Sequence, residues 1–314
     1  MTALFQTALE GRFNQPALWQ WKDRIETRPG EFVRGGWAIP DNPRALVVVL
    51  GGLSEYIEKY FETFNDLLAR GYAVAQMDWR GQGQSWRHAD KHHYRVADDF
   101  DLDRIDIETF ITMIPLEIRI PRIMLAHSMG ANIGLRLLKS TRDHFRCAVM
   151  TAPMFGINMP IPLPLARLLA AGTRLAGLTH TYLPMSGGWD EKHFESNILR
   201  LTSDDGRRDM QRYWMKNEKL RMGGLTFDWL RAAFASIDIV KNPVWLRDIK
   251  TPVLLVEAEG EKIVSNIAIR RAAKALPNAT LITVSGSLHE VLMERDVYRN
   301  QFWSAFDGFV AKYV

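Results

Sequence analysis

The stretch that decides the fold is Ile123-Met124-Leu125-Ala126-His127-Ser128-Met129-Gly130-Ala131. It begins as a short apolar run, which predicts a buried strand, and continues from Ala131 to Lys139 in a helical pattern. A serine at the apex of a tight turn between a strand and a helix is typical of a nucleophile elbow. The usual pattern is G-x-S-x-G, with small residues that let the strand and the helix pack closely. Ala126 replaces the first glycine here, and we expect the turn to tolerate its methyl group.

Ser128 is therefore the candidate nucleophile, and a hydroxyl nucleophile needs a base. The backbone N–H of Met129 would lie at the N-terminus of the following helix, where developing negative charge is favoured. His289 follows the last apolar run of the chain, beyond its carboxyl end. We expect it to be the general base, because sites built on this elbow follow the chain order serine, acid, histidine.

The acid that orients the histidine should follow the preceding apolar run, Val253–Val256. Three glutamates compete there. Glu257 is expected to lie on the strand still, whereas Glu261 lies furthest into the loop and precedes an apolar pair that would anchor it. Glu261 is our choice, with Glu259 as the alternative.

Further short apolar runs alternate with helical patterns, which predicts a parallel sheet covered on both faces. These runs are Leu46–Leu50, Tyr72–Met77, Cys147–Met150, Val253–Val256 and Leu281–Val284. An earlier pair, around Arg24–Thr27 and Phe32–Ile39, turns at Pro29-Gly30 and predicts an antiparallel hairpin at the sheet edge.

The alternation stops between about residues 154 and 245, a stretch without a convincing strand. Helical patterns occur instead around Leu165–Leu178, Asp209–Met215 and Phe227–Ile237. We therefore expect a core of residues 1–153 and 246–314 and a helical cap inserted as residues 154–245.

The composition indicates a packed protein rather than a disordered one. Hydrophobic residues make up 47% of the 314 residues and charged residues 24%, and the formal net charge is +4. So small an excess of positive charge gives no reason to expect nucleic-acid binding. The one cysteine, Cys147, excludes an internal disulfide. Without a secretory leader or an uninterrupted apolar span, we expect a cytoplasmic protein.

A second motif follows the apolar run that ends at Leu50, and reads Gly51-Gly52-Leu53-Ser54-Glu55-Tyr56-Ile57-Glu58-Lys59-Tyr60. With the elbow and the His289 segment, it resembles the α/β-hydrolase branch that contains monoacylglycerol lipases and bacterial lysophospholipases. That branch has His-Gly-x-x-Glu-x-x-x-Arg-Tyr at this place. Our sequence has lysine for the arginine and Gly51 for the histidine. By this resemblance, the backbone N–H of Leu53 joins that of Met129 in an oxyanion hole.

A third motif, Asp78–Ser85 (DWRGQGQS), is similar to the D-x-R-G-x-G-x-S pattern of the same branch. It also invites comparison with a dinucleotide-binding loop, but Trp86 stands where the third glycine of G-x-G-x-x-G is needed. We interpret it as a structural turn that braces the oxyanion loop.

The resemblance implies an α/β-hydrolase fold, with a mostly parallel eight-stranded sheet flanked by helices and an inserted helical cap. It further implies a serine ester hydrolase that forms an acyl-enzyme with Ser128 and needs no metal or organic cofactor. An apolar cap favours a monoacyl lipid, either a lysophospholipid or a monoacylglycerol, as substrate. The segment Ile157–Leu178 could then dock peripherally on a membrane.

Two other classes of function stay open. The same fold hosts hydrolases of other small esters and peptidases. A peptidase would need an acidic anchor for the substrate amine, for which Asp190, Glu191 and Glu195 are available. A catalytically silent lipid-binding module is the non-enzyme alternative, and the intact serine, glutamate and histidine positions argue against it. The sequence does not predict an oligomeric state.

Overall fold

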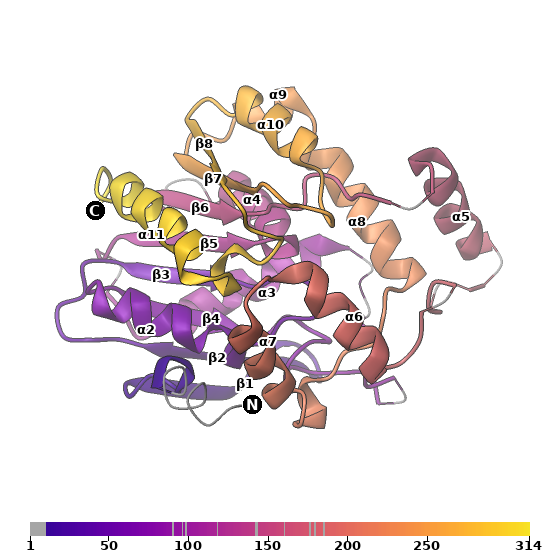
Figure 1. Ribbon diagram of the computed structural model, residues 1–314, viewed down its shortest axis with the longest axis horizontal. Coiled ribbons are helices and arrows are strands. Elements are labelled where there is room, and N and C mark those ends of the chain that lie inside the picture. Colours follow the sequence, from indigo (N-terminus) through magenta and orange to yellow (C-terminus); the bar gives the residue numbers. More distant parts are fainter. Residues whose placement is uncertain are drawn as a thin grey trace.

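The computed structural model describes residues 11–89, 91–95, 97, 99–117, 119–141, 144–159, 161–175, 177–178, 180–184 and 186–314. These residues form one sheet of eight strands with helices on both faces (Figure 1). The strand order is β1-β2-β4-β3-β5-β6-β7-β8, and every pair from β4 to β8 is parallel. The predicted α/β fold with a mostly parallel eight-stranded sheet is confirmed.

The parallel strands coincide with the apolar runs of the sequence. They are β3 (Leu46–Leu50), β4 (Ala73–Met77), β5 (Arg122–His127), β6 (Cys147–Thr151), β7 (Val253–Ala258) and β8 (Ala279–Val284). The predicted hairpin is β1 (Trp19–Arg28) and β2 (Glu31–Ala38), and β2 continues the sheet antiparallel to β4. The edge position and the antiparallel direction of the hairpin are therefore confirmed.

Alternate residues of the central strands pack into two separate cores. Val47 and Val49 of β3 face the core under α2 (Phe61–Ala69) and α11 (Asp296–Val310). Leu46 and Val48 face the larger core on the other side. The helices over that core are α3 (Phe100–Met113), α4 (Met129–Ser140), α8 (Phe227–Val240) and α10 (Asn266–Ala275). Because both faces are covered, the strands read as continuous apolar runs.

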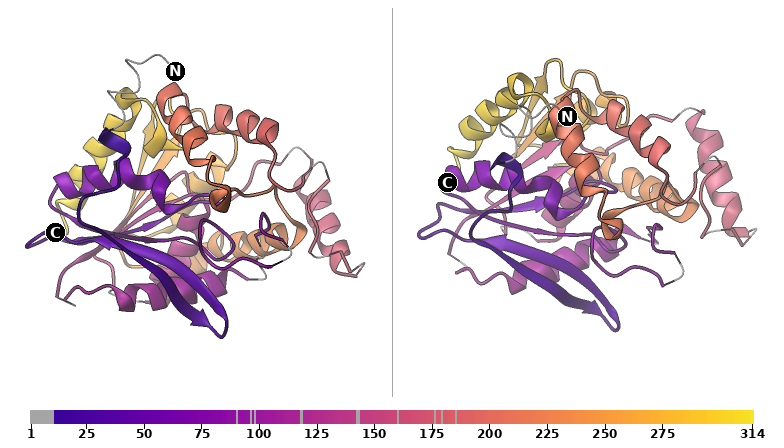
Figure 2. Two further views of the ribbon diagram at one scale, coloured as in Figure 1. Left: turned by 90° about the horizontal axis from the view of Figure 1, so that it is seen from below. Right: turned by 60° about the horizontal axis from the view of Figure 1, so that its bottom comes forward.

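The stretch between β6 and β7 is helical, and its described residues add no strand to the sheet. Its helices are α5 (Leu163–Leu175), α6 (Glu191–Leu201), α7 (Asp205–Trp214), α8 and α9 (Pro243–Arg247). Of these, α8 packs in the larger core, whereas α5 lies at the outer edge of the molecule in every view (Figures 1 and 2). The predicted division into a core and a cap at residues 154 and 245 stays a prediction.

The apolar segment Ile157–Leu178 contains α5, while its Pro160 and Ala176 lie outside the described residues. Throughout the described part of the chain, every helix is too short or too polar to cross a membrane.

Candidate active site

The elbow has the sharp backbone that its sequence predicts. Ser128 connects β5 directly to α4, with φ of 52° and ψ of −115°. A non-glycine residue with positive φ is strained and persists only where the surroundings enforce it. Gly130 shows the enforcement, because a Cβ there would lie 2.4 Å from the carbonyl oxygens of Leu50 and Gly51. The first turn of α4 thus packs directly on the end of β3, and only glycine fits.

Ser128, His289 and Glu261 lie in one hydrogen-bonded row. Nε2 of His289 is 3.1 Å from Oγ of Ser128, and Nδ1 is 2.7 Å from Oε2 of Glu261. An ionised carboxylate only accepts, so the ring hydrogen belongs on Nδ1, which leaves Nε2 to accept from the serine hydroxyl. The ring therefore has the tautomer that a general base requires.

The other two glutamates of the loop point elsewhere. Glu257 lies on β7 and accepts from Arg270 and the hydroxyl of Thr283, while the exposed Glu259 accepts from the N–H of Gly286. The structure thus brings Glu261, and not the alternative Glu259, to His289.

Glu261 is held as a charged group. Its Oε1 accepts from the backbone N–H groups of Ile263 at 2.7 Å and Val264 at 3.1 Å. Burial alone would raise the pKa of Glu261, but the hydrogen bond with His289 and these two N–H groups hold that pKa below its ordinary value. The negative charge that would stabilise a protonated His289 is therefore present at neutral pH.

The loop after β3 runs beside the elbow and presents a free N–H. A Cβ on Gly52 would lie 3.3 Å from Cβ of Ser128. Gly52 itself donates its N–H to Glu55. The N–H groups of Leu53 and Met129, by contrast, donate to no acceptor within the described residues. Two unused donors beside a serine are what an oxyanion hole needs.

The motif Asp78–Ser85 braces this loop, as the sequence predicts. Trp79 donates its Nε1–H to the carbonyl of Gly51 at 2.7 Å, and the amide of Gln82 donates to the carbonyls of Gly52 and Glu55. Asp78 accepts from the N–H of Ile57 at 2.9 Å. These hydrogen bonds from the motif hold the oxyanion loop in place.

A buried lysine links the oxyanion loop to the histidine loop. Nζ of Lys59 is 2.7 Å from Glu55 and 2.5 Å from Glu290, the residue after His289. Burial alone would lower the pKa of Lys59, but Glu290 and Glu55 raise it above its ordinary value. Burial would also raise the pKa of Glu55, yet Lys59 lowers it to about 2. Both groups are therefore charged at neutral pH, and the ion pair holds the two loops together.

His127 lies between these groups but is neutral. Its ring centroid is 4.8 Å from that of His289, and its Nδ1 lies 3.0 Å from the hydroxyl of Thr151. Burial lowers the pKa of His127 to about 4. An uncharged ring at this position adds no repulsion when His289 takes a proton.

The insertion supplies one wall of the site. Trp229 of α8 lies against Met129, with its Nε1 3.4 Å from the sulfur. A small cavity lies between the oxyanion loop and the insertion. It is lined by Leu53, Ser54, Met222, Leu225 and Trp229, among others. Arg95 and Thr226 also line it, so apolar and polar side chains meet next to the oxyanion donor Leu53.

Sequence reasoning missed the contacts that hold the histidine loop. Lys59 and Glu290 belong to the quoted motifs, but their pairing joins residues 231 positions apart. Gln211 of α7, which donates to Glu290 at 3.0 Å, carries no signal in the sequence. The lysine at position 59, in place of the arginine of the lipase pattern, was the one available hint.

The chain is similar to known lysophospholipases and has the fold of a known lipase. The chain is 29% identical to a probable lysophospholipase L2 of Haemophilus influenzae, over 96% of this chain and 98% of that one. It is also 29% identical to lysophospholipase L2 of Escherichia coli, over 90% and 86%. Among solved structures, a soluble variant of monoglyceride lipase from Saccharomyces cerevisiae has the same fold, with a TM-score of 0.74, 16% identity and coverage of 96% and 98%.

A family model described as serine aminopeptidase, S33, matches residues 41–296, which include the elbow, the oxyanion loop and the histidine loop. Because the match spans most of the chain, the protein belongs to this family of α/β-hydrolases.

Proposed function

We propose that the protein is a serine carboxylic-ester hydrolase that cleaves monoacyl lipids through an acyl-enzyme. One observation carries the proposal, namely the row of hydrogen bonds from Ser128 through His289 to Glu261. The two unused N–H groups of Leu53 and Met129 beside that row add to it.

In the first step, Oγ of Ser128 attacks the ester carbonyl carbon while its proton moves to Nε2 of His289. The N–H groups of Leu53 and Met129 stabilise the negative oxygen of the tetrahedral intermediate. The intermediate collapses, its C–O bond breaks, and the leaving alcohol takes the proton from Nε2. Water then attacks the acyl-enzyme with His289 again as base, and the carboxylic acid leaves as Ser128 recovers its proton. Glu261 keeps the ring oriented and stabilises its charged form.

The substrate class rests on the relatives and on the insertion. Lysophospholipases are among the relatives that match most of the chain, and a monoglyceride lipase has the same fold. Trp229 and Leu225 of the insertion add apolar side chains beside the oxyanion donor Leu53. We therefore favour lysophospholipids and monoacylglycerols over short soluble esters.

Two of the three carboxylates that a peptidase could use as an amine anchor make local contacts. Asp190 accepts from the N–H of His193 at the start of α6, and Glu195 pairs with Arg212 at 2.7 Å. An aminopeptidase needs a carboxylate free to bind the substrate's amine. Two of the three candidate carboxylates are therefore engaged, and the third, Glu191, is exposed at the start of α6.

α5 gives the proposed enzyme a surface for peripheral membrane contact. Leu165, Leu168 and Leu169 are 46%, 69% and 52% exposed. They recur at helical spacing, so they form one apolar stripe. A helix with such a stripe binds at the interface of a lipid bilayer.

The test is fatty-acid release from a long-chain monoacylglycerol and from a lysophospholipid, by the wild type and Ser128→Ala. We expect release from at least one substrate, and a loss of at least about 10³-fold in the variant. The ratio between the two substrates identifies the preferred head group. If the wild type releases no fatty acid yet reacts with a fluorophosphonate probe at Ser128, the lipid substrate is wrong. If it does neither, the silent binding module is favoured.

A further inference from the structure

Glu294 is a buried carboxylate that fastens the loop of His289. Its Oε1 accepts from the N–H of Leu288 at 2.9 Å and from the N–H of Ser203 at 3.0 Å. Its Oε2 accepts from the hydroxyl of Ser203 at 2.6 Å and from the N–H of Arg295 at 3.1 Å. The side chain is inaccessible to solvent, so these four donors replace its hydration.

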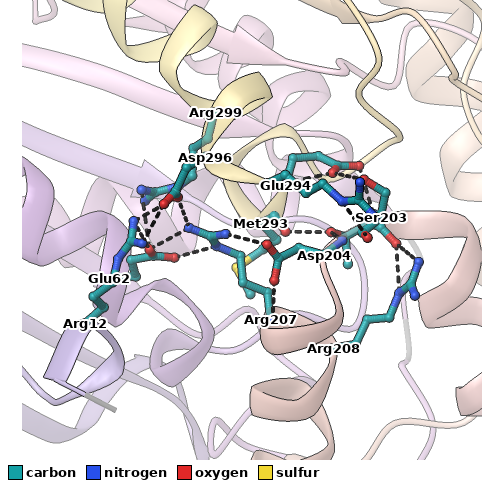
Figure 3. Close-up of polar contacts among 12 residues, drawn as sticks. Arg12, Glu62, Ser203, Asp204, Arg207, Arg208, Met293, Glu294, Asp296 and Arg299 are labelled. Atoms are coloured by element: carbon teal, nitrogen blue, oxygen red, sulfur yellow. Dashed lines mark hydrogen bonds and ion pairs between the residues drawn. The ribbon is translucent and has the colours of Figure 1, made fainter. Parts of the chain in front are cut away.

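The contacts of Glu294 enclose His289 from both sides. Leu288 precedes the histidine directly and Glu294 ends the loop, so the bond between them ties its two ends. Ser203, the third partner, comes from the insertion, between α6 and α7, and lies beside Glu294 in Figure 3. The loop is thereby attached to a segment 91 residues away in the chain.

The same segment makes two more bonds to the loop. The N–H of Glu290 donates to the carbonyl of Leu201 at 2.8 Å, and the hydroxyl of Thr202 donates to the carbonyl of Met293 at 2.6 Å. Residues 201–203 thus bond the loop at three points along its length. The loop contains one short 3-10 helix, Val291–Met293, and these bonds fix it against the insertion.

We propose that Glu294 is a positioning residue for His289, and that Ser203 of the insertion is its partner in this role. The inference rests on the proposed function of His289 as general base. A shift of about 1 Å in a catalytic group lowers the rate by as much as 10²-fold. By this proposal, the insertion helps to fix the geometry of the reaction.

The set of four donors explains why a carboxylate is needed and predicts a graded series of variants. In Glu294→Gln, the amide oxygen can replace Oε1 and keep the N–H groups of Leu288 and Ser203. The amide nitrogen then faces the serine hydroxyl, which can turn to accept, and only the N–H of Arg295 loses its partner. Glu294→Ala loses all four bonds, and Ser203→Ala loses one.

The experiment measures kcat and KM on p-nitrophenyl butyrate, and the rate of fluorophosphonate labelling at Ser128, for these three variants. We expect kcat and the labelling rate to fall by 10-fold to about 100-fold in Glu294→Ala, with KM changed little. Glu294→Gln should keep kcat within about fivefold of the wild type, and Ser203→Ala should lower it by about fivefold.

Glu257→Ala is the matched control. Glu257 is also buried, and it accepts from Arg270 of α10 and Thr283 of β8. Because it does not bond the loop of His289, its loss should lower stability without lowering kcat. Urea unfolding of each variant separates the two effects.

The inference is overturned if Glu294→Ala lowers kcat no more than Glu257→Ala does, or if KM rises while kcat is unchanged. If Glu294→Ala does not fold, the Ser203→Ala variant becomes the test. An unchanged kcat in that variant overturns the inference. A wild type that neither hydrolyses the ester nor reacts with the probe would contradict the proposed function first, and the inference with it.

Discussion

The helices α7 and α5 belong to the same insertion and are attached in opposite ways. α7 is fixed by buried charges. Its Arg207 is 1% exposed and bonds Glu62 of α2 at 2.8 Å and Asp296 of α11 at 2.7 Å. α5 packs through small residues, because Ala166 and Ala170 are the buried apolar ones among its described side chains, while Leu165, Leu168 and Leu169 are exposed. This arrangement reverses the usual one, in which large apolar residues face the core.

The difference separates two tasks within one insertion. Around Arg207, the side chains of Arg12, Glu62, Asp296 and Arg299 form a polar group that we call the inner cluster (Figure 3). The cluster holds the base of the insertion against the core, next to the loop of His289. The outer helix, α5, keeps an exposed apolar stripe, which is the surface we propose for lipid contact. Three predictions test this contrast through the free energy of unfolding.

The largest effect is expected from Arg207→Ala in the inner cluster. The substitution leaves Glu62 buried with only Arg12 at 2.7 Å and Arg299 at 3.5 Å as partners. Removing one side of a buried ion pair costs about 3 kcal/mol or more. We therefore expect the free energy of unfolding in urea to fall by about 3 kcal/mol.

Arg212→Ala on the same helix is the control. Arg212 also pairs with a carboxylate, Glu195 at 2.7 Å, but both side chains are 38% exposed. An exposed pair is worth about 0–1 kcal/mol. Equal losses in the two variants would show that burial does not distinguish the inner cluster from the surface of α7.

The strands and the elbow could be predicted because their signals are local. An apolar run such as Leu46–Leu50 is buried on both faces, so its composition alone indicates a strand. α6 was not predicted, and the reason is physical. Its apolar stripe is short, because Phe194, Ile198 and Leu201 recur at helical spacing within a helix of 11 residues, and Ile198 is the one of the three that is buried.

The candidate site, too, could be predicted only where its signals are local. The elbow gave Ser128, and the chain order gave His289. The choice between Glu259 and Glu261 depended on where β7 ends, and its boundary at Ala258 cannot be derived from the composition of the loop. Contacts between distant segments, such as Glu294 with Ser203, depend on how the insertion folds back on the core. No short-range pattern encodes them.

A smaller effect is expected from Asp296→Asn, and it should depend on pH. The hydrogen bond from Arg12, and after it that from Arg207, holds the pKa of Asp296 below its ordinary value, against the effect of burial. In the unfolded chain the pKa of an aspartate is about 3.9. The contribution of Asp296 to stability is therefore present above about pH 4 and is lost as the pH falls toward the folded pKa.

The side chain of Asp296 is 53% exposed, so solvent screens its ion pairs. We expect Asp296→Asn to lower the free energy of unfolding by less than about 1 kcal/mol at pH 7. The difference from the wild type should shrink between about pH 5 and pH 2. Urea unfolding at pH 7, 5 and 3 measures it. A difference that is the same at all three values would contradict an ionic contribution.

The smallest effect on stability is expected from the triple variant Leu165→Gln, Leu168→Gln and Leu169→Gln on α5. These side chains are exposed, and glutamine has nearly the helix propensity of leucine. The free energy of unfolding should therefore change by less than about 0.5 kcal/mol. Binding to vesicles of phosphatidylethanolamine and phosphatidylglycerol, measured by sedimentation, should fall at least about 10-fold, because three apolar side chains no longer enter the bilayer.

Val297→Gln is the control, since Val297 is 65% exposed but lies on α11, away from α5 in Figure 1. It should bind vesicles like the wild type. Unchanged binding in the triple variant would mean that the exposed leucines do not contact lipid. A loss of stability of about 3 kcal/mol would mean instead that they pack like the inner cluster. The contrast between α7 and α5 holds only if replacing the leucines weakens vesicle binding and leaves the free energy of unfolding nearly unchanged.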